Sequence, residues 1–333
     1  MSERGRTRDF THCCPVFYSL ITDYFELYMR TVYGIGETIC DIIFKDEQPQ
    51  AARAGGSTFN ALVSLGRMQV NSTFISKIGD DKIGQFILNF MRQNHISTDN
   101  MSIWQGHKTD IALAFLNDQG DAEYSFYKAY DQQFVEAPIP DFKQDDILLF
   151  GSYFALNPLL RPLIERLVEA AKAAKAIIYY DPNFRSSHAH EVESLRHMIY
   201  QNMEAATIVR GSDEDFENIF AGHPEDFKRL SPKVPRLITT RNAQGVDVVD
   251  GSAAYHFPSQ RIVPVSTIGA GDSFNAGFIY GLLAHQITYD DVHKLSAQQW
   301  ESLVNMAILF STEVCQSYDN YISEAFAQEL INV

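Results

Sequence analysis

One segment of the sequence places an aspartate directly after a glycine-rich turn: Pro264-Val265-Ser266-Thr267-Ile268-Gly269-Ala270-Gly271-Asp272-Ser273-Phe274-Asn275-Ala276-Gly277. It predicts a β-strand that stops at two glycines, followed by a helix from Ser273 to about Ala284. The Gly-Ala-Gly turn leaves the backbone N–H groups of Gly269, Ala270 and Gly271 facing an anion, with the positive end of the helix behind them. Asp272 would then take a proton from an attacking hydroxyl while the N–H groups hold a phosphoryl group.

The same segment also suits a plain helix start, because aspartate is a common N-cap. It is not a Walker A loop, since no Gly-Lys-Ser/Thr follows. It is not a dinucleotide fingerprint either, since Phe274 stands where the third glycine belongs. Alone, the segment leaves a phosphoryl-transfer site and a capped turn equally open.

A second glycine-rich segment lies far upstream, Ala54-Gly55-Gly56-Ser57-Thr58-Phe59-Asn60. It resembles the Gly-Gly…Asn sugar-binding segment of the ribokinase-like (PfkB) family of sugar kinases. The segment around Asp272 resembles that family's Asp-Thr-x-Gly-Ala-Gly-Asp signature, and the likeness runs from about Thr31 to Val333. It implies an α/β fold: a three-layer α/β/α domain with a mostly parallel central sheet and a small β lid.

Length and composition agree with a globular enzyme. The chain has 333 residues, of which 45% are hydrophobic, enough for a full core. A formal net charge of −15 argues against nucleic acid or an anionic membrane as a partner. No apolar run is long enough to span a bilayer, and the four cysteines lack zinc or disulfide spacing. These features predict a cytoplasmic protein.

The N-terminal residues 1–28 stand apart from the rest. Met29 lies immediately before Arg30, and the first predicted strand follows at 31–36. Charged residues interrupt the apolar stretch upstream, so a signal peptide is not indicated. We therefore expect 1–28 to be an extension, either from a misassigned start codon or as a genuine appendage. Residues 29–333 are expected to form a single kinase domain.

Strand-like and helix-like patterns alternate along the chain, which predicts a mostly parallel sheet covered on both faces. The expected strands are 31–36, 72–78, 147–150, 176–180, 207–209, 236–240 and 246–249. The expected helices are 58–65, 83–94, 158–174, 192–202, 214–220, 297–315 and 324–331. The order is broken by an extended stretch at 40–54 and by a hairpin with its turn at 118–121. The resemblance implies that segments at about 40–54 and 109–131 form a lid over the sugar, and such lids often provide homodimer contacts.

Several residues are candidates for the sugar side of the site. Gly55 and Gly56 would let a sugar approach the backbone, and Asn60 offers a donor and an acceptor to its hydroxyls. The alternative is an ordinary turn capped by Ser57 or Thr58. Relatives often carry Lys where Ser57 stands, so the substrate can differ here.

Other candidates follow from the resemblance. Asp41, in Gly36-Glu37-Thr38-Ile39-Cys40-Asp41, matches an aspartate that binds sugar hydroxyls, although a solvated strand end is the alternative. Tyr127 and Lys128 end the hairpin where fructokinase-like members carry an arginine that reaches the substrate. Asp181-Pro182-Asn183-Phe184-Arg185 resembles the Asp-x-Asn-x-Arg of keto-sugar kinases, with Asn183 and Arg185 on the phosphate side; the same residues also make a good turn.

The nucleotide side departs more from the family pattern. Ser212 and Asp215 stand where the family has Asn-x-x-Glu, which helps hold Mg2+ through water; a helix cap with acids in the first turn is the favoured alternative. Thr240 and Gly245 would lie along the ATP phosphates, with Asn242 replacing a glycine that needs a left-handed backbone. Ser266 replaces an aspartate that often helps bind a monovalent cation, which weakens the case for activation by K+.

Together these residues predict a kinase that uses ATP and Mg2+ to phosphorylate a sugar, with Asp272 as general base. Fructose is the favoured acceptor and 2-keto-3-deoxygluconate the second choice. A non-catalytic sugar or nucleotide sensor is the alternative from another class. An oxidoreductase is disfavoured because the glycine fingerprint is absent.

Overall fold

The computed structural model describes residues 30–45, 47–116, 122–128, 134, 136–221, 234–259 and 261–332. The expected N-terminal extension 1–28 and the expected hairpin turn at 118–121 lie outside these ranges. In the described residues no helix combines the length and the apolar character needed to cross a membrane.

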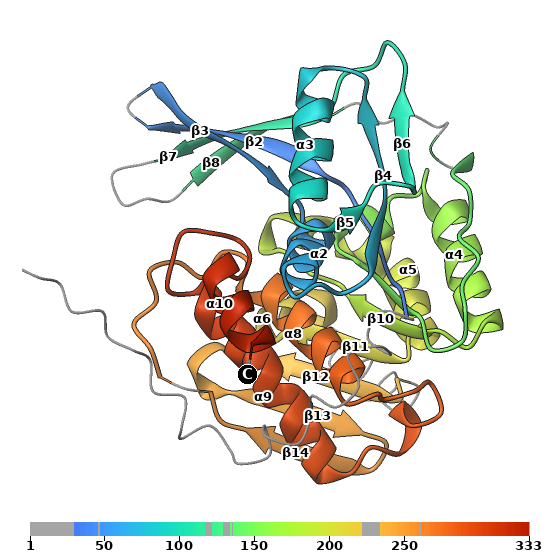
Figure 1. Ribbon diagram of the computed structural model, residues 1–333. Coiled ribbons are helices and arrows are strands. Elements are labelled where there is room, and N and C mark those ends of the chain that lie inside the picture. The colour runs from blue at the N-terminus through green and yellow to red at the C-terminus, as the bar shows by residue number, and fades with distance from the viewer. Residues whose placement is uncertain are drawn as a thin grey trace, which may run out of the picture.

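The centre of the molecule is one large sheet of ten strands in the described part of the chain (Figure 1). Its order is β14-β13-β12-β11-β10-β9-β1-β4-β5, with β6 also paired to β4. All pairs are parallel except β12–β13 and β13–β14. The strands are β1 Val32–Ile35, β4 Ser72–Gly79, β5 Ile96–Ser97, β6 Met101–Trp104, β9 Ile147–Gly151, β10 Ile177–Asp181, β11 Ile208–Ser212, β12 Arg236–Thr240, β13 Val246–Asp250 and β14 Ala253–Phe257.

Helices cover both faces of this sheet because its central strands are apolar on both sides. Along β9, Ile147 and Leu149 belong to one hydrophobic cluster, whereas Leu148 and Phe150 belong to the other. The first cluster includes residues of α2 Ser57–Arg67, α3 Lys82–Gln93, α8 Ala270–Ala284, α9 Ala297–Val314 and α10 Glu324–Ile331. The second includes residues of α4 Arg161–Ala173, α5 Val192–Ala205 and α6 Asp213–Phe220. The expected three-layer α/β/α arrangement is therefore confirmed.

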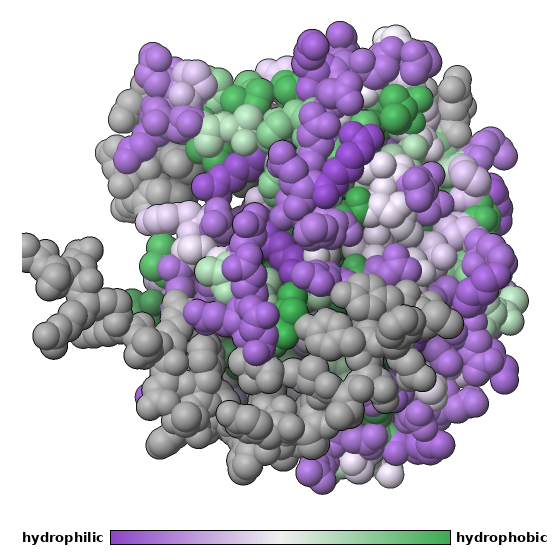
Figure 2. Space-filling model, viewed as in Figure 1, coloured by the Kyte–Doolittle hydropathy of each residue, from purple (hydrophilic) through white to green (hydrophobic). Residues whose placement is uncertain are grey.

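A separate four-stranded sheet projects from the body, at the upper left of Figure 1. It runs β3-β2-β7-β8 and consists of β2 Ile39–Lys45, β3 Gln48–Gly55, β7 Ile111–Leu116 and β8 Ala122–Tyr127. Phe44 and Phe115 stack on it with ring centroids 5.0 Å apart. Phe115 and Phe126 are 41% and 58% exposed. Figure 2 shows hydrophobic side chains gathered on this projecting part.

The predicted strand before the Gly-Ala-Gly turn is wrong. Residues 261–268 contain no strand, although their valines and isoleucines suit one. The N–H group of Val265 donates to the carbonyl of Cys315, 2.8 Å away, at the end of α9. Val263 is 94% exposed. The segment has strand-forming residues, but no strand in the described part of the chain pairs with it.

Two further predicted boundaries need correction. Helix α8 begins at Ala270, not at Ser273, and its N-cap is Gly269 in a left-handed conformation with φ 78°. Strand β11 continues to Ser212 instead of ending at residue 209, because Arg210 is accommodated in the buried part of the sheet. The short strands β5, β6 and β14 were not predicted.

Candidate active site

The candidate site lies at the carboxyl edge of the parallel strands. The strands β1, β10 and β11 all end there, and α2 and α8 both begin near it, since the first residues of these two helices are hydrogen-bonded to each other. Ligands of open α/β sheets bind at this edge because the loops that follow the strands converge there. The two glycine-rich segments, far apart in the sequence, thus meet.

Asp272 is the centre of this meeting point. It is the third residue of α8 and only 8% exposed. Its Oδ1 accepts a hydrogen bond from Ser57 Oγ at 2.7 Å, and its Oδ2 accepts one from Asn60 Nδ2 at 2.9 Å. Asp272 is therefore not the N-cap of α8. Its side chain is held by the first turn of α2.

A third segment completes the arrangement. Asn183 Nδ2 donates to Ser57 Oγ at 2.8 Å, so that Ser57 links Asn183 to Asp272. The left-handed backbone of Asn183, with φ 38°, is supported by its own N–H group, which donates to Asp181 Oδ1 at 3.0 Å. Ser57 thus has a bridging position. The alternative interpretation, in which Ser57 or Thr58 caps the helix, is wrong because Gly56 is the N-cap of α2.

The surroundings of Asp272 adjust its acidity. Burial raises the pKa of its carboxyl from 3.8 to about 6, although the hydrogen bonds from Asn60 and Ser57 act in the opposite direction. The negative charge of Asp181 raises the pKa further, and the positive charge of Arg185 lowers it. A carboxyl with this pKa is ionised at neutral pH and is a stronger base than an exposed aspartate.

Asp41 is a second acid with similar properties. It lies on β2, and burial is the main cause that raises the pKa of its carboxyl to about 6. Arg185 and Lys128 lower this pKa, while Glu37 raises it. Arg185 is exposed and its charge acts on both Asp41 and Asp272. The structure therefore brings the two predicted acids and Arg185 into one electrostatic neighbourhood.

The two adjacent glycines of the upstream segment are required by the chain itself. A Cβ on Gly56, whose φ is 137°, would lie 2.3 Å from the carbonyl oxygen of Glu37. A Cβ on Gly55 would lie 3.2 Å from Asp41 Oδ2. Gly56 thus allows α2 to start against the backbone that follows β1, and Gly55 leaves space for the Asp41 carboxylate.

The predicted lid residues lie apart from this centre. Lys128 Nζ donates to Glu37 Oε2 at 2.6 Å, so that the end of the hairpin is tied to the segment after β1. Tyr127 is 60% exposed.

The Gly-Ala-Gly turn has the conformation that its sequence suggests. A Cβ on Gly269 would lie 2.4 Å from the carbonyl oxygen of Asn320, so this position requires glycine. The first bond of the helical ladder is from Ser273 N–H to the carbonyl of Gly269 at 2.9 Å. The N–H group of Ala270 donates to the carbonyl of Thr267 at 3.2 Å. The N–H groups of Gly271 and Asp272, in the first turn, have no place in the ladder.

Arg210 is a residue of this region that the sequence analysis missed. It is 7% exposed, and its guanidinium donates to Asp181 Oδ2 at 3.0 Å and to Thr240 Oγ1 at 2.7 Å. A Cβ on Gly271 would lie 2.9 Å from its Nη1, so the guanidinium lies directly behind the turn. The available signal was an arginine next to an apolar strand, a position where a charge needs a buried partner.

The predicted nucleotide residues have structural roles in this state. Ser212 and Asp215 form a capping box at α6: Ser212 Oγ accepts from Asp215 N–H at 3.0 Å, and Asp215 Oδ2 accepts from Ser212 N–H at 2.7 Å. Asn242 has the expected left-handed backbone, with φ 49°, and Gly245 has φ 107°. Among the described residues no group of three or more His, Cys, Asp or Glu could hold a metal ion.

A buried carboxylate in the first turn of a helix, at the carboxyl edge of a three-layer α/β/α fold, suits a phosphotransferase with an alcohol acceptor. The comparison with known families gives the particular group. The chain belongs to the pfkB family of carbohydrate kinases, whose sequence model matches residues 29–323.

Similar proteins agree with this assignment. The chain is 26% identical over 277 residues to the fructokinase of Vibrio alginolyticus, covering 82% of this chain and 90% of that protein. It is 28% identical over 270 residues to the probable fructokinase-6, chloroplastic, of Arabidopsis thaliana, covering 77% and 67%. A crystal structure of fructokinase from Vibrio cholerae O395 with fructose, ADP and calcium ion has a TM-score of 0.76 at 19% identity, covering 91% of this chain and 99% of that one. The aminoimidazole riboside kinase of Salmonella enterica has a TM-score of 0.74 at 18% identity, with the same coverage.

The raised pKa values of Asp41 and Asp272 predict how turnover depends on pH. Asp41 and Asp272 both have a pKa of about 6, and the roles predicted for them, sugar contact and general base, need the ionised form. We therefore expect kcat/KM to fall as the pH drops through 6. Below pH 6 the plot of log(kcat/KM) against pH should approach a slope of about 2 for the native enzyme and about 1 for Asp41→Asn. Steady-state kinetics between pH 5 and 8 measures this. Asp290→Asn, an exposed carboxylate at the opposite edge of the sheet, is the control, and a native profile that stays flat down to pH 5 would contradict the assignment.

The buried ion pair behind the turn predicts a coupling in stability. Arg210→Met leaves the Asp181 carboxylate, 3% exposed, without its guanidinium, so it should cost about 3–5 kcal/mol of unfolding free energy. Asp181→Asn should also destabilise, and the double variant should lose at least ~1 kcal/mol less than the sum. Urea unfolding of the four proteins measures this coupling. The exposed pair Lys172–Glu169, 3.6 Å apart, is the control and should couple by less than ~1 kcal/mol; additive losses at Arg210 and Asp181 would show that the pair is not a unit.

Proposed function

We propose that this carbohydrate kinase transfers the γ-phosphoryl group of ATP to a primary hydroxyl of a sugar, and that fructose is its favoured acceptor. The observation that carries the proposal is the Asp272 carboxylate, which is buried in the first turn of α8 and held by Ser57 and Asn60. Residues 29–333 would act as one catalytic domain, with the four-stranded sheet as its lid. A cytoplasmic location belongs to the same proposal.

The acceptor would bind between Asp41, Gly55, Gly56, Asn60 and the lid. Asn60 donates to Asp272 through Nδ2, whereas its Oδ1 is buried without a hydrogen-bond partner among the described atoms, so it is available to a sugar hydroxyl. The Asp41 carboxylate can accept two hydrogen bonds from neighbouring hydroxyls. Closure of the lid over the bound sugar would exclude water from the site and so suppress ATP hydrolysis in competition with transfer to the sugar.

In the chemical step Asp272 takes the proton of the sugar hydroxyl as the sugar oxygen forms its bond to the γ-phosphorus. The bond from that phosphorus to the bridging oxygen breaks, and ADP leaves with the electron pair. Negative charge on the transferring group is stabilised by the positive end of α8, with the N–H groups of Gly269 and Gly271 and the Arg210 guanidinium behind them. The N–H group of Ala270 can join only by leaving Thr267.

ATP would lie along the carboxyl edge of the sheet, with its phosphates near Thr240, Gly245 and Ser212 and with Asn183 and Arg185 on the acceptor side. Mg2+ would accompany the phosphates and neutralise their charge, and it usually keeps several water ligands. Asp215 would contact Mg2+ through a water ligand and not directly, because its Oδ2 already accepts two hydrogen bonds from Ser212. Ser266 carries no charge and accepts from the N–H group of Ile268 at 3.2 Å, so we do not propose a K+ site.

The experiment that tests the function is ADP release with a panel of sugars. Fructose-dependent ADP formation is the expected result. Preference for 2-keto-3-deoxygluconate would move the assignment to an acid sugar. Saturable sugar binding without turnover would favour the sensor alternative, which pfkB family membership disfavours.

Replacing the proposed base separates catalysis from folding. Asp272→Asn should lower kcat by roughly 10²–10⁴, the usual contribution of a positioned general base, with sugar affinity little changed. At pH 8 its melting temperature should not fall, because the substitution removes a charge that burial disfavours. Glu214→Gln, an exposed acid of α6, is the matched control. Near-native turnover of Asp272→Asn would refute the role of this carboxylate.

We also propose that the exposed apolar face of the lid forms a homodimer. Phe115 is 41% exposed and stacks on Phe44, and it lies on the same face of the sheet as Tyr127, which is 60% exposed. Large exposed apolar side chains that gather on one face are typical of an interaction surface. Sedimentation equilibrium should show a dimer at micromolar concentration, and Phe115→Ser should shift it towards the monomer. Ile103→Ser, on β6 of the central sheet, should leave the dimer intact. A native monomer would refute this proposal.

A further inference from the structure

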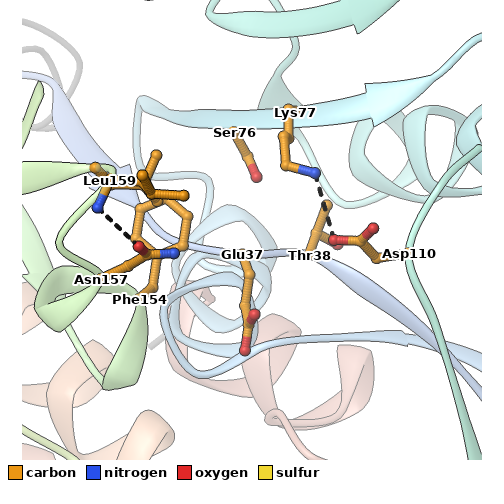
Figure 3. Close-up of a pocket in the computed structure, with 9 residues that line it drawn as sticks. Glu37, Thr38, Ser76, Lys77, Asp110, Phe154, Asn157 and Leu159 are labelled. Atoms are coloured by element: carbon orange, nitrogen blue, oxygen red, sulfur yellow. Dashed lines mark hydrogen bonds and ion pairs between the residues drawn. The ribbon is translucent and has the colours of Figure 1, made fainter. Parts of the chain in front are cut away.

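A small pocket opens beside the proposed acceptor site, at the ends of β1, β4 and β9 (Figure 3). Figure 3 shows side chains from segments far apart in the sequence turned towards one space. Its lining residues are Glu37, Thr38, Ser76, Lys77, Asp110, Phe154, Asn157, Leu159 and Leu160. No role was predicted for this pocket, and the transfer step proposed above does not use it.

Thr38 is the residue that points to a ligand. It is 3% exposed, and its Oγ1 has no hydrogen-bond partner among the described protein atoms. A buried hydroxyl without a partner costs about 1–3 kcal/mol relative to one that is paired. A threonine at this position is therefore explained by a polar group that enters the pocket and bonds to it.

The rest of the lining suits a group with both polar and apolar surface. Ser76 Oγ donates to the carbonyl of Gly36 at 2.7 Å, and its lone pairs can still accept. Phe154 and Leu160 supply a buried apolar wall. One apolar wall with a few convergent polar groups is the usual composition of a small-molecule site.

The charges of the pocket are balanced in pairs. Lys77 Nζ lies 3.5 Å from Asp110 Oδ2, and both side chains are mostly buried. Glu37 is paired with Lys128 at 2.6 Å. A neutral hydroxylated group leaves both pairs intact. A carboxylate or phosphate would enter between two carboxylates and compete for their lysines, which costs electrostatic energy.

The pocket and the acceptor site share Glu37. Its side chain lines the pocket, its charge raises the pKa of Asp41, and its carbonyl packs against Gly56. A ligand held by Asp41 and Asn60 would therefore have the pocket within reach of its end away from Asp272.

From these observations we propose that the pocket is a subsite for the end of the sugar remote from the phosphorylated hydroxyl, and that it selects a neutral, hydroxyl-bearing group. This rests on the proposed sugar kinase function and narrows it. Thr38 Oγ1 would bond to the remote hydroxyl, and the balanced charges would exclude acid sugars and sugar phosphates.

The test compares the best neutral acceptor of the panel with its two terminal deoxy analogues, in native enzyme and in Thr38→Val. The analogue that lacks the reacting hydroxyl will not turn over. The other lacks the remote hydroxyl, and native kcat/KM for it should be about tenfold or more lower than for the parent sugar. Thr38→Val should reduce this ratio to below about twofold, and its melting temperature without sugar should equal or exceed that of the native protein, because the removed hydroxyl has no partner.

Thr73→Val is the matched control: Thr73 is buried on β4, and its Oγ1 accepts from Asn100 Nδ2 at 3.0 Å. Thr73→Val should lower the melting temperature but keep the native ratio of kcat/KM between the parent sugar and the analogue that lacks the remote hydroxyl. If Thr38→Val keeps the native ratio of kcat/KM between the parent sugar and the analogue without the remote hydroxyl, the subsite is overturned. Better turnover of an acid sugar than of its neutral analogue would also overturn it.

Thermal stabilisation by added sugar separates the subsite proposal from the kinase proposal. Binding of the parent sugar that is weakened by Thr38→Val, without turnover, would support the subsite and refute the kinase activity, whereas no stabilisation and no turnover with any neutral sugar would overturn both.

Discussion

The rest of the site depends on one buried carboxylate and the two hydrogen bonds that hold it. Asp272 lies in the first turn of α8, and Ser57 and Asn60 lie in the first turn of α2, so their bonds join the starts of two helices that are far apart in the sequence. Burial makes the charged form costly, and the hydrogen bonds recover only part of that cost, which leaves the carboxyl with a pKa of about 6. Burial of the Asp272 carboxylate lowers the stability of the folded protein at neutral pH, and the same burial makes this carboxylate a stronger proton acceptor.

The residues behind the site neutralise a buried charge, the carboxylate of Asp181. Asp181 is buried below the turn and accepts bonds from Arg210 and Asn275, at 3.0 and 2.6 Å. Asn275 is itself in α8, and Arg210 reaches Thr240 on β12. This network connects β10, β11, β12 and α8 at the place where the turn needs a fixed backbone. A positive guanidinium behind the first turn of α8 also strengthens the field of the helix towards an anion.

The small four-stranded sheet and the pocket are connected through Glu37, so in the proposed kinase both would influence which sugar is accepted. The Lys128–Glu37 pair ties the end of β8 to the segment after β1, and Glu37 faces both Asp41 and the pocket. A change in the lid therefore acts directly on the groups that would contact the sugar. The same small sheet carries an exposed apolar face, so that association of two chains and shape of the acceptor site would be linked through one element.

Much of the fold was predictable because it follows from local pattern. Apolar runs of strand length alternate with helical periodicity, and most of the predicted elements match those of the central layers. The failures have a common cause. Residues 261–268 have strand-forming side chains, but none of the strands that the structure describes pairs with them. Strand β11 contains an arginine whose burial depends on the buried partner Asp181.

Several candidate site residues could be predicted from the sequence alone: the paired glycines, Asp41, Asn60, Asn183 and Asp272. They lie in short motifs at turns, where the residue type reflects local backbone requirements and side-chain chemistry. The tertiary structure decided how they are used: that Ser57 bridges Asn183 and Asp272, that Asp215 is engaged in a capping box, and that Arg210 lies behind the turn. It also revealed Thr38 as a buried hydroxyl without a partner. The burial, the hydrogen-bond partners and the pKa of a side chain depend on residues that lie far from it in the sequence. These properties are therefore decided only when the chain folds.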